Sequence, residues 1–283
     1  VELNGDYGAF NDLALRVKRA KDLFLIIGPP GTGKTSYGLL NTVKEELLSP
    51  DSNILLLSYT NRAVDEICSK LKKDGIGFIR MGSPLSCAPI YREHLLCSIA
   101  HDTHNVNELK NILLSTRVIV GTTTSLNSNI ALFQLKQFSL AVVDEASQIL
   151  EPHLIGLLSA HADGVPAIRK FVLIGDHKQL PAVVQQSLEI SKVEDKCLKE
   201  ILLTDCRLSL FERLLKRYRD DKDVTYMLTK QGRMHHDIAL FPNYCFYNNQ
   251  LEEVPLDHQE ACLPLVGKGE NGIDDLLATR RIA

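Results

Sequence analysis

The sequence contains no tryptophan, and it lacks any apolar run of the roughly eighteen residues that a membrane-spanning helix needs. Its first residues, VELNGDYGAF, show no basic segment followed by an apolar one, so we expect neither a secretion signal nor a membrane partner. An excess of positive charge is also missing, because the net charge is −3. Since dedicated nucleic-acid clamps are usually basic overall, a nucleic-acid partner would have to be held by a local groove.

Cysteine pairs with the spacing of metal ribbons are absent as well. The chain has seven cysteines, an odd number, and no two of them form a C-x-x-C pair. This pattern argues against a disulfide framework or a zinc ribbon, and it predicts reduced thiols in the cytoplasm or the nucleus. We interpret the individual cysteines as small residues of the core.

What the chain does contain is a series of short apolar runs, each followed by a polar or glycine-rich turn. These runs lie at residues 24–27, 54–58, 117–121, 140–144 and 171–175. Helical spacing follows two of them, at 34–48 and 61–72. Apolar strands without alternation, separated by helices, predict an α/β fold with a parallel sheet covered on both faces. Ligands bind such sheets at the carboxyl ends of the strands, which is where the polar motifs lie.

The first motif, GPPGTGKT at 28–35, fits the phosphate-loop pattern G-x-x-x-x-G-K-[ST] between a strand and a helix. Glycines let backbone N–H groups turn inward around phosphate oxygens, and the start of the helix adds positive potential. Lys34 is expected to reach the β and γ phosphates, and the Thr35 hydroxyl to bind Mg²⁺. The predicted phosphate-binding residues are Gly28, Pro29, Pro30, Gly31, Thr32, Gly33, Lys34, Thr35 and Ser36.

The second motif, VVDEAS at 142–147, ends an apolar run in two adjacent carboxylates. As partner to a phosphate loop, Asp144 is expected to hold Mg²⁺ and Glu145 to orient and deprotonate an attacking water. The two motifs together predict hydrolysis of a nucleoside triphosphate, with ATP and Mg²⁺ as cofactors.

Three classes of nucleotide hydrolase share these two motifs. A GTPase would carry an N/T-K-x-D motif, which the sequence does not contain. An AAA+ ATPase and a helicase both remain compatible with the phosphate loop and the acidic pair alone.

Five further motifs bear on this choice. They are SYTNRAVDEI (58–67), GTTTSL (121–126), GDHKQLPAV (175–183), SLFERLL (209–215) and QGRMHHDIALFPNYCFYNNQL (231–251). In this order, and together with the phosphate motif and the acidic motif, they resemble the superfamily 1 helicases of the 5′-to-3′ branch. The group most similar contains the nonsense-mediated-decay helicase and its DNA-replication and immunoglobulin-switch relatives. The resemblance implies two RecA-like domains, with ATP between them and single-stranded DNA or RNA across their top.

The resemblance also implies roles for residues outside the phosphate loop. Arg233 matches an arginine that the second domain extends to the γ-phosphate, and a planar, permanent cation suits the charge of the transition state. Gln179 matches a glutamine that senses the γ-phosphate and links it to nucleic-acid binding. His235 and His236 are interpreted as helix-start and packing residues.

Small hydroxyl and amide side chains are predicted to contact the nucleic-acid backbone. Such groups at helix starts bind phosphates without reading bases. The residues that match are Ser58, Thr60, Asn61, Thr122, Thr123 and Thr124. Thr60 and Asn61 can also cap the helix at 62–72. The basic residues Arg213, Lys216, Arg217 and Arg219 are interpreted as the solvated face of a helix that opens with a capping box at Ser209.

Two residues that read the base in such helicases are missing. Family members usually carry a glutamine upstream of the phosphate loop, but no glutamine precedes Gln134. They also usually have tyrosine where Gly232 stands. We therefore expect weak discrimination among ATP, GTP and CTP.

We expect a first RecA-like ATPase domain over residues 1–222, with 83–106 as an insertion or a lid. Residues 225–229 are predicted to form a strand that opens a partial second RecA-like domain, 223–283. A full second domain needs well over about 100 residues, so only its start is expected.

The predicted function is an ATP-dependent helicase or translocase core that works as a monomer. Two alternatives remain: a P-loop ATPase switch that binds nucleic acid without unwinding it, and a nucleic-acid-binding module with a vestigial ATPase. The intact Lys34 and the Asp144–Glu145 pair argue against the vestigial one.

Overall fold

The computed structural model describes residues 1–260 and groups the chain into two compact units. The first unit comprises Val1–Ile27 and Lys34–Tyr226, and the second comprises Gly28–Gly33 and the residues from Met227 onward. Of the predicted partial second domain, 223–283, the part from position 261 onward lies outside the described residues. No helix in residues 1–260 is long and apolar enough to cross a membrane.

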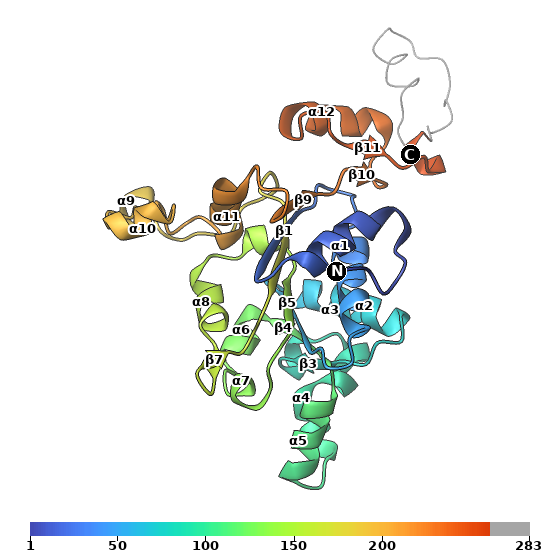
Figure 1. Cartoon of the computed structure of the whole chain (residues 1–283), viewed down its shortest axis with the longest axis vertical. Coiled ribbons are helices and arrows are strands. Elements are labelled where there is room, and N and C mark those ends of the chain that lie inside the picture. The colour runs from blue at the N-terminus through green and yellow to red at the C-terminus, as the bar shows by residue number, and fades with distance from the viewer. Residues whose placement is uncertain (261–283) are drawn as a thin grey trace, which may run out of the picture. The chain divides into compact units, whose positions relative to one another are not determined.

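A seven-stranded sheet forms the centre of the first unit (Figure 1). Its order is β3 (Ile79–Met81), β4 (Val118–Thr122), β2 (Ile54–Ser58), β5 (Leu140–Val143), β8 (Phe171–Gly175), β1 (Leu23–Ile27) and β9 (Thr225–Met227). The pairings from β3 to β1 are parallel. The five predicted strands are confirmed, and the continuous apolar runs are explained because every residue of β2, β4 and β5 is buried.

Helices cover both faces of this sheet, as the sequence predicted (Figure 1). One face carries α1 (Asn11–Arg19), α2 (Leu40–Leu47) and α3 (Asn61–Lys73), and the other carries α6 (Thr123–Asn127), α8 (Pro152–Leu158) and α11 (Leu210–Tyr218). The predicted helix at 34–48 opens with a wider π-helical segment, Lys34–Leu39, before α2. The remaining helices of the first unit are α4 (Leu96–Asp102), α5 (Val106–Ser115), α7 (Leu132–Leu135), α9 (Leu188–Ser191) and α10 (Lys196–Glu200).

The region 83–106 consists of short helical turns, Pro84–Ser86 and Pro89–His94, followed by α4. Its role as an insertion or a lid stays a prediction. A small antiparallel pair, β6 (His161–Ala162) and β7 (Val165–Pro166), lies between α8 and β8 in the chain.

The second unit contains α12 (His236–Phe246) and a parallel pair of short strands. These strands are β10 (Lys230–Gln231) and β11 (Glu252–Glu253), and a 3₁₀ turn follows at Asp257–Gln259. The strand predicted at 225–229 is present but shorter, and β9 joins the edge of the large sheet beside β1. The backbone N–H of Leu25 donates to the carbonyl of Val224, 2.8 Å away, at this edge. That residues 223–283 form part of a second RecA-like domain stays a prediction.

Two interpretations of surface and core are also wrong. Cys68 and Cys87 are buried, but four of the described cysteines, Cys97, Cys197, Cys206 and Cys245, are exposed. Arg213 does not lie on a solvated face either, because it is buried against Glu151. The capping box at the start of α11 is confirmed, with Ser209 and Glu212 bonding each other's backbone N–H groups.

Candidate active site

The phosphate motif connects β1 to the helical segment that starts at Lys34. Gly31 and Gly33 both have φ near 75°, a left-handed conformation that glycine adopts without a steric cost. The turn is closed by the Thr32 hydroxyl, which donates to the Pro29 carbonyl over 2.7 Å. This is the local geometry that a loop needs in order to point successive N–H groups at one anion.

The acidic motif leaves the end of β5, the strand that pairs with β8 and β2. Asp144 is almost fully buried, and its Oδ1 accepts a hydrogen bond of 3.0 Å from the backbone N–H of Glu145. Glu145 itself has φ 53° and ψ 37°, a left-handed conformation that is strained for a residue with a side chain. The turn thus aims two successive carboxylates in different directions.

The first unit brings four predicted residues together in two pairs. The Thr35 hydroxyl lies 2.9 Å from Oδ2 of Asp144, and the Lys34 ammonium lies 3.4 Å from Oε1 of Glu145. All four side chains come from segments that directly follow β1 or β5. The convergence at the carboxyl ends of parallel strands, expected from the sequence, is therefore present for these residues.

The electrostatics of Asp144 follow from its surroundings. Burial, and after it the charge of Glu145, raise the pKa of Asp144 to about 6, against the opposing hydrogen bond from Thr35. A buried carboxylate next to a hydroxyl oxygen is a hard-oxygen donor set, which suits Mg²⁺. The residues present therefore fit the predicted metal.

The loop that follows β8 carries Gln179. Its side-chain amide donates to Oδ2 of Asp176 over 2.7 Å, and the backbone N–H of Asp176 donates to the Ser147 hydroxyl over 3.2 Å. A Cβ added at Gly175 would lie 2.8 Å from the backbone nitrogen of Ser147. The Gln179 loop thus packs tightly against the segment that follows Glu145, although Gln179 bonds Asp176 and not the acidic pair.

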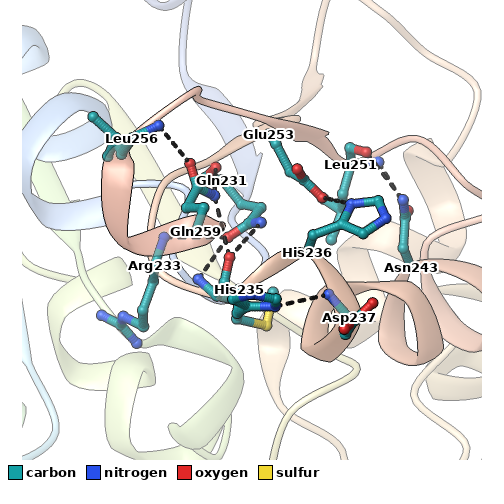
Figure 2. Close-up of polar contacts among 11 residues, drawn as sticks. Gln231, Arg233, His235, His236, Asp237, Asn243, Leu251, Glu253, Leu256 and Gln259 are labelled. Carbon is teal, nitrogen blue, oxygen red and sulfur yellow. Dashed lines mark hydrogen bonds and ion pairs between the residues drawn. The ribbon is translucent and has the colours of Figure 1, made fainter. Parts of the chain in front are cut away.

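The turn that carries Arg233 is held by two buried glutamines of the second unit (Figure 2). Oε1 of Gln231 accepts from the backbone N–H groups of Arg233 and Met234, at 3.1 and 2.8 Å. The amide of Gln259 donates to the carbonyls of Gln231 and Met234, at 3.1 and 3.2 Å. In Figure 2 the guanidinium of Arg233 points away from these polar contacts. Within residues 1–260 it makes no ion pair or hydrogen bond.

The same unit contains a close approach between this turn and the phosphate loop. The backbone N–H of Gly232 donates to the Gly31 carbonyl over 3.0 Å. A Cβ at Gly31 would lie 2.6 Å from Cβ of Arg233. Glycine is therefore required at position 31 for two reasons, its positive φ and the neighbouring backbone of Arg233.

The two histidines have the structural roles expected of them. The His235 ring accepts from the backbone N–H of Asp237 over 3.1 Å and caps α12. His236 pairs instead with Glu253, with 2.7 Å between its Nδ1 and Oε1. Throughout the described part of the chain, no three His, Cys, Asp or Glu side chains are grouped as a metal cluster would require.

The predicted nucleic-acid residues divide into buried and surface positions. Ser58 is fully buried, and its hydroxyl donates to the Asp144 carbonyl over 3.4 Å; Thr122 and Thr123 are buried too. The side chains with surface exposure are Thr60, Asn61 and Thr124. Thr60 accepts from the backbone N–H of Ala63 over 3.2 Å, so it caps α3 as predicted.

Gln259 was missed by sequence reasoning, although it supports the Arg233 turn by donating to the carbonyl of Gln231, 28 residues earlier in the chain. A single buried glutamine in a 3₁₀ turn has no pattern that marks it. The conformation of Glu145 was also missed, because no residue type at that position signals a left-handed backbone.

Comparison with known proteins accounts for these motifs. A family model described as an AAA domain matches residues 11–106 and 92–187, more than half of the chain, and a second of the same description matches 206–270. The chain belongs to this family of AAA domains. It is 35% identical over 240 residues to the DNA replication ATP-dependent helicase/nuclease DNA2 of Xenopus laevis. It is 37% identical over 238 residues to the DNA replication ATP-dependent helicase/nuclease JHS1 of Arabidopsis thaliana.

These alignments cover 84% of the chain but only 20% and 16% of the two relatives, so the chain spans about a fifth of their length. The predicted resemblance to superfamily 1 helicases is confirmed by the family models and these relatives. Among solved structures, an Arterivirus nonstructural protein 10 (helicase) in complex with DNA matches with a TM-score of 0.51 at 16% identity. That match covers 90% of this chain and 47% of the other, and it confirms the predicted RecA-like α/β fold.

Proposed function

We propose that the protein is an ATP-dependent helicase or translocase core that couples nucleotide hydrolysis to movement on single-stranded nucleic acid. The observation that carries this proposal is the double pairing of Thr35 with Asp144 and of Lys34 with Glu145. Hydrolysis of a nucleoside triphosphate needs these four groups within reach of one phosphate chain. Their intact geometry argues against a vestigial ATPase.

The nucleotide would be held through its phosphates by the loop Gly28–Gly33, by Lys34 and by Ser36. Thr35 and Asp144 would hold Mg²⁺, which would neutralise charge that develops on the phosphate oxygens. Lys34 would supply a point charge for the β and γ phosphates, because its ammonium lies beside the carboxylate of Glu145, where the phosphates are proposed to bind.

Glu145 is the group proposed to accept the proton of the attacking water. It is partly exposed, whereas Asp144 is buried, so only Glu145 has access to solvent. Its backbone is left-handed, and its carboxylate lies 3.4 Å from the ammonium of Lys34. Two carboxylates in two environments can therefore take two roles, one for the metal and one for the water.

Arg233 is proposed to stabilise the charge of the γ-phosphate, and Gln179 to sense it. The hydrogen bond from Gly232 to Gly31 supports the first role, because it ties the arginine turn to the loop that would hold the phosphates. The bond between Gln179 and Asp176, on a loop packed against Ser147, supports the second. Both residues would make hydrolysis depend on conformational steps.

Single-stranded DNA is the proposed substrate, with the surface groups Thr60, Asn61 and Thr124 contacting its phosphates. The names of the DNA replication relatives support DNA, and they support a protein that acts inside the cell. Residues 1–222 would be the first RecA-like domain and 223–283 part of the second, with the protein acting as a monomer. A switch that hydrolyses ATP without unwinding remains the second candidate.

The deciding experiment is steady-state ATP hydrolysis by the whole chain, with no nucleic acid, with single-stranded DNA and with single-stranded RNA. Turnover that DNA stimulates more than RNA, and that Glu145→Gln abolishes, is the expected result. Turnover insensitive to either strand would contradict a nucleic-acid motor. A duplex-unwinding assay then separates a helicase from a switch.

A further inference from the structure

Two aromatic rings stack at the surface of the first unit, just after Lys34 and Thr35. The rings of Phe10 and Tyr37 are nearly coplanar, at 8°, and their centroids are 4.4 Å apart. Tyr37 is 47% exposed, so one face or edge of this stack meets solvent. The chain has few aromatic residues and no tryptophan, so an exposed stack of two rings is not a by-product of an aromatic-rich composition.

The segment that carries Phe10 is clamped to the helix that follows Tyr37. Glu45 of α2 is 3% exposed, and it accepts from the backbone N–H groups of Asn4 and Gly5, at 2.9 and 3.0 Å. Its carboxylate also accepts from the Tyr7 hydroxyl at 2.8 Å and pairs with Lys18 at 2.6 Å. Burial raises the pKa of Glu45, but these hydrogen bonds outweigh it and leave the pKa lowered.

This clamp fixes the ring of Phe10 behind that of Tyr37. The backbone N–H of Tyr7 adds a further bond of 2.7 Å to the side chain of Asn11, at the start of α1. Phe10 ends the short 3₁₀ turn between these two anchors. The chain on both sides of Phe10 is therefore held in place by hydrogen bonds, and Phe10 holds its ring against that of Tyr37.

The position of the stack suits one part of a nucleotide. Tyr37 lies two residues after Thr35 in the same helical segment, within about one turn of it. In a nucleoside triphosphate the base is separated from the α-phosphate by a single ribose, so it must lie near the phosphate-binding residues. Exposed aromatic rings bind bases by stacking, and they do so without regard to the hydrogen-bonding edge of the base.

We propose that Tyr37, supported by Phe10, is the stacking platform for the base of the bound nucleotide. This inference rests on the proposed function, because it assumes that the phosphates bind at Lys34 and Thr35. It refines the expectation of weak discrimination among nucleotides: ATP and GTP bind alike, and the larger area of the purine ring favours both over CTP and UTP. The Tyr37–Phe10 stack would then contact the base in place of the upstream glutamine that this chain lacks and of the tyrosine replaced by Gly232.

Isothermal titration of the whole chain with ATP, GTP, CTP and inorganic tripolyphosphate, each with Mg²⁺, tests this assignment. Tyr37→Ala and Phe10→Ala are expected to weaken ATP and GTP binding about tenfold while tripolyphosphate binding stays unchanged. Tyr37→Phe keeps the ring and is expected to bind as the wild type does. Tyr244→Ala removes an exposed tyrosine of α12, far from Lys34 in the chain, and serves as the control.

Unchanged tripolyphosphate binding also shows that the variants fold. If wild type binds ATP and tripolyphosphate, and both alanine variants bind ATP as tightly as wild type, the platform is overturned but the proposed function is not. Loss of tripolyphosphate binding in the same variants would mean that the stack only supports the fold, and would also overturn the assignment. If wild type binds neither ligand, while Lys34→Ala changes nothing, both proposals fail.

Discussion

The ammonium of Lys34 lies 3.4 Å from the carboxylate of Glu145. The cation proposed to bind the phosphates therefore also contacts the carboxylate proposed to accept the proton of water. Replacing Glu145 by Gln removes the proton acceptor and a negative charge beside the nucleotide. We expect turnover to fall at least about 100-fold, because general-base groups contribute that much. ATP binding should be kept or become tighter, since Lys34 then has no competing anion.

Measuring kcat and nucleotide affinity on the same preparation checks this pair of effects. Glu189→Gln, a change of the same type in α9, is the matched control and should alter neither quantity. Weaker ATP binding in Glu145→Gln would contradict the competition between carboxylate and phosphate for Lys34.

Arg233 is expected to act on the rate and not on binding. Arg233→Lys keeps a positive charge but loses the planar fork, so it should not rescue catalysis. We expect kcat for ATP to fall roughly 10³-fold or more, as for other arginines that stabilise a transferring phosphoryl group. ATP affinity should change little, and titration beside single-turnover hydrolysis separates the two. A lysine variant with near-normal turnover would rule out the proposed role.

Arg213 and Glu151 form a mostly buried ion pair that joins α11 to the segment after Asp144. Nε of Arg213 lies 2.8 Å from Oε2 of Glu151, and Nη1 donates to the Ile201 carbonyl over 2.9 Å. Arg213→Leu leaves the carboxylate without its partner, which should lower the free energy of unfolding by about 3 kcal/mol. Lys216→Leu, an exposed change on the same helix, should cost less than about 0.5 kcal/mol. Urea unfolding followed by circular dichroism compares the two variants.

Lys136 supplies a pH-dependent contribution to stability. It is buried, and its ammonium donates to the carbonyls of Leu113, Leu114 and Thr116, at 3.1, 2.7 and 2.8 Å. Burial, and then repulsion by Arg117, lower its pKa from 10.5 to about 8. Between these values the unfolded chain binds a proton that the folded chain does not, so the stability contributed by Lys136 rises with pH across this window.

Lys136→Met removes both the donors and this titration. The variant should be less stable than wild type by about 1–3 kcal/mol, because it leaves buried carbonyls without donors. The difference should widen between about pH 7.5 and pH 9.5, since only wild type gains stability there. Thermal unfolding of both proteins at the two pH values provides the check, and a difference that narrows would show the opposite pKa shift.

Much of the first unit could be predicted because its strands are buried on both faces and its motifs sit at strand ends. The runs at 54–58 and 171–175 match β2 and β8 residue for residue. The pairing of Thr35 with Asp144 follows from two local motifs and the rule that places ligands at carboxyl ends. Local pattern and global fold agree at these positions.

What could not be predicted depends on partners far apart in the chain. Arg213 lies among other basic residues, which is typical of a solvated helix face. It is buried because it forms an ion pair with Glu151, which is 62 residues away in the chain. The strand at Thr225–Met227 is only three residues long and half-buried, so its own pattern does not indicate that it lies beside β1 at the edge of the sheet. Ser58 and Thr122 have polar side chains, but the strand ends that carry them are buried, so residue type alone does not predict exposure.

The left-handed backbone of Glu145 sets stability and turnover against each other at a single position. A residue with a side chain pays roughly 1–2 kcal/mol to hold this conformation, and glycine does not. Glycine at position 145 would therefore make the folded protein more robust while removing its proposed base.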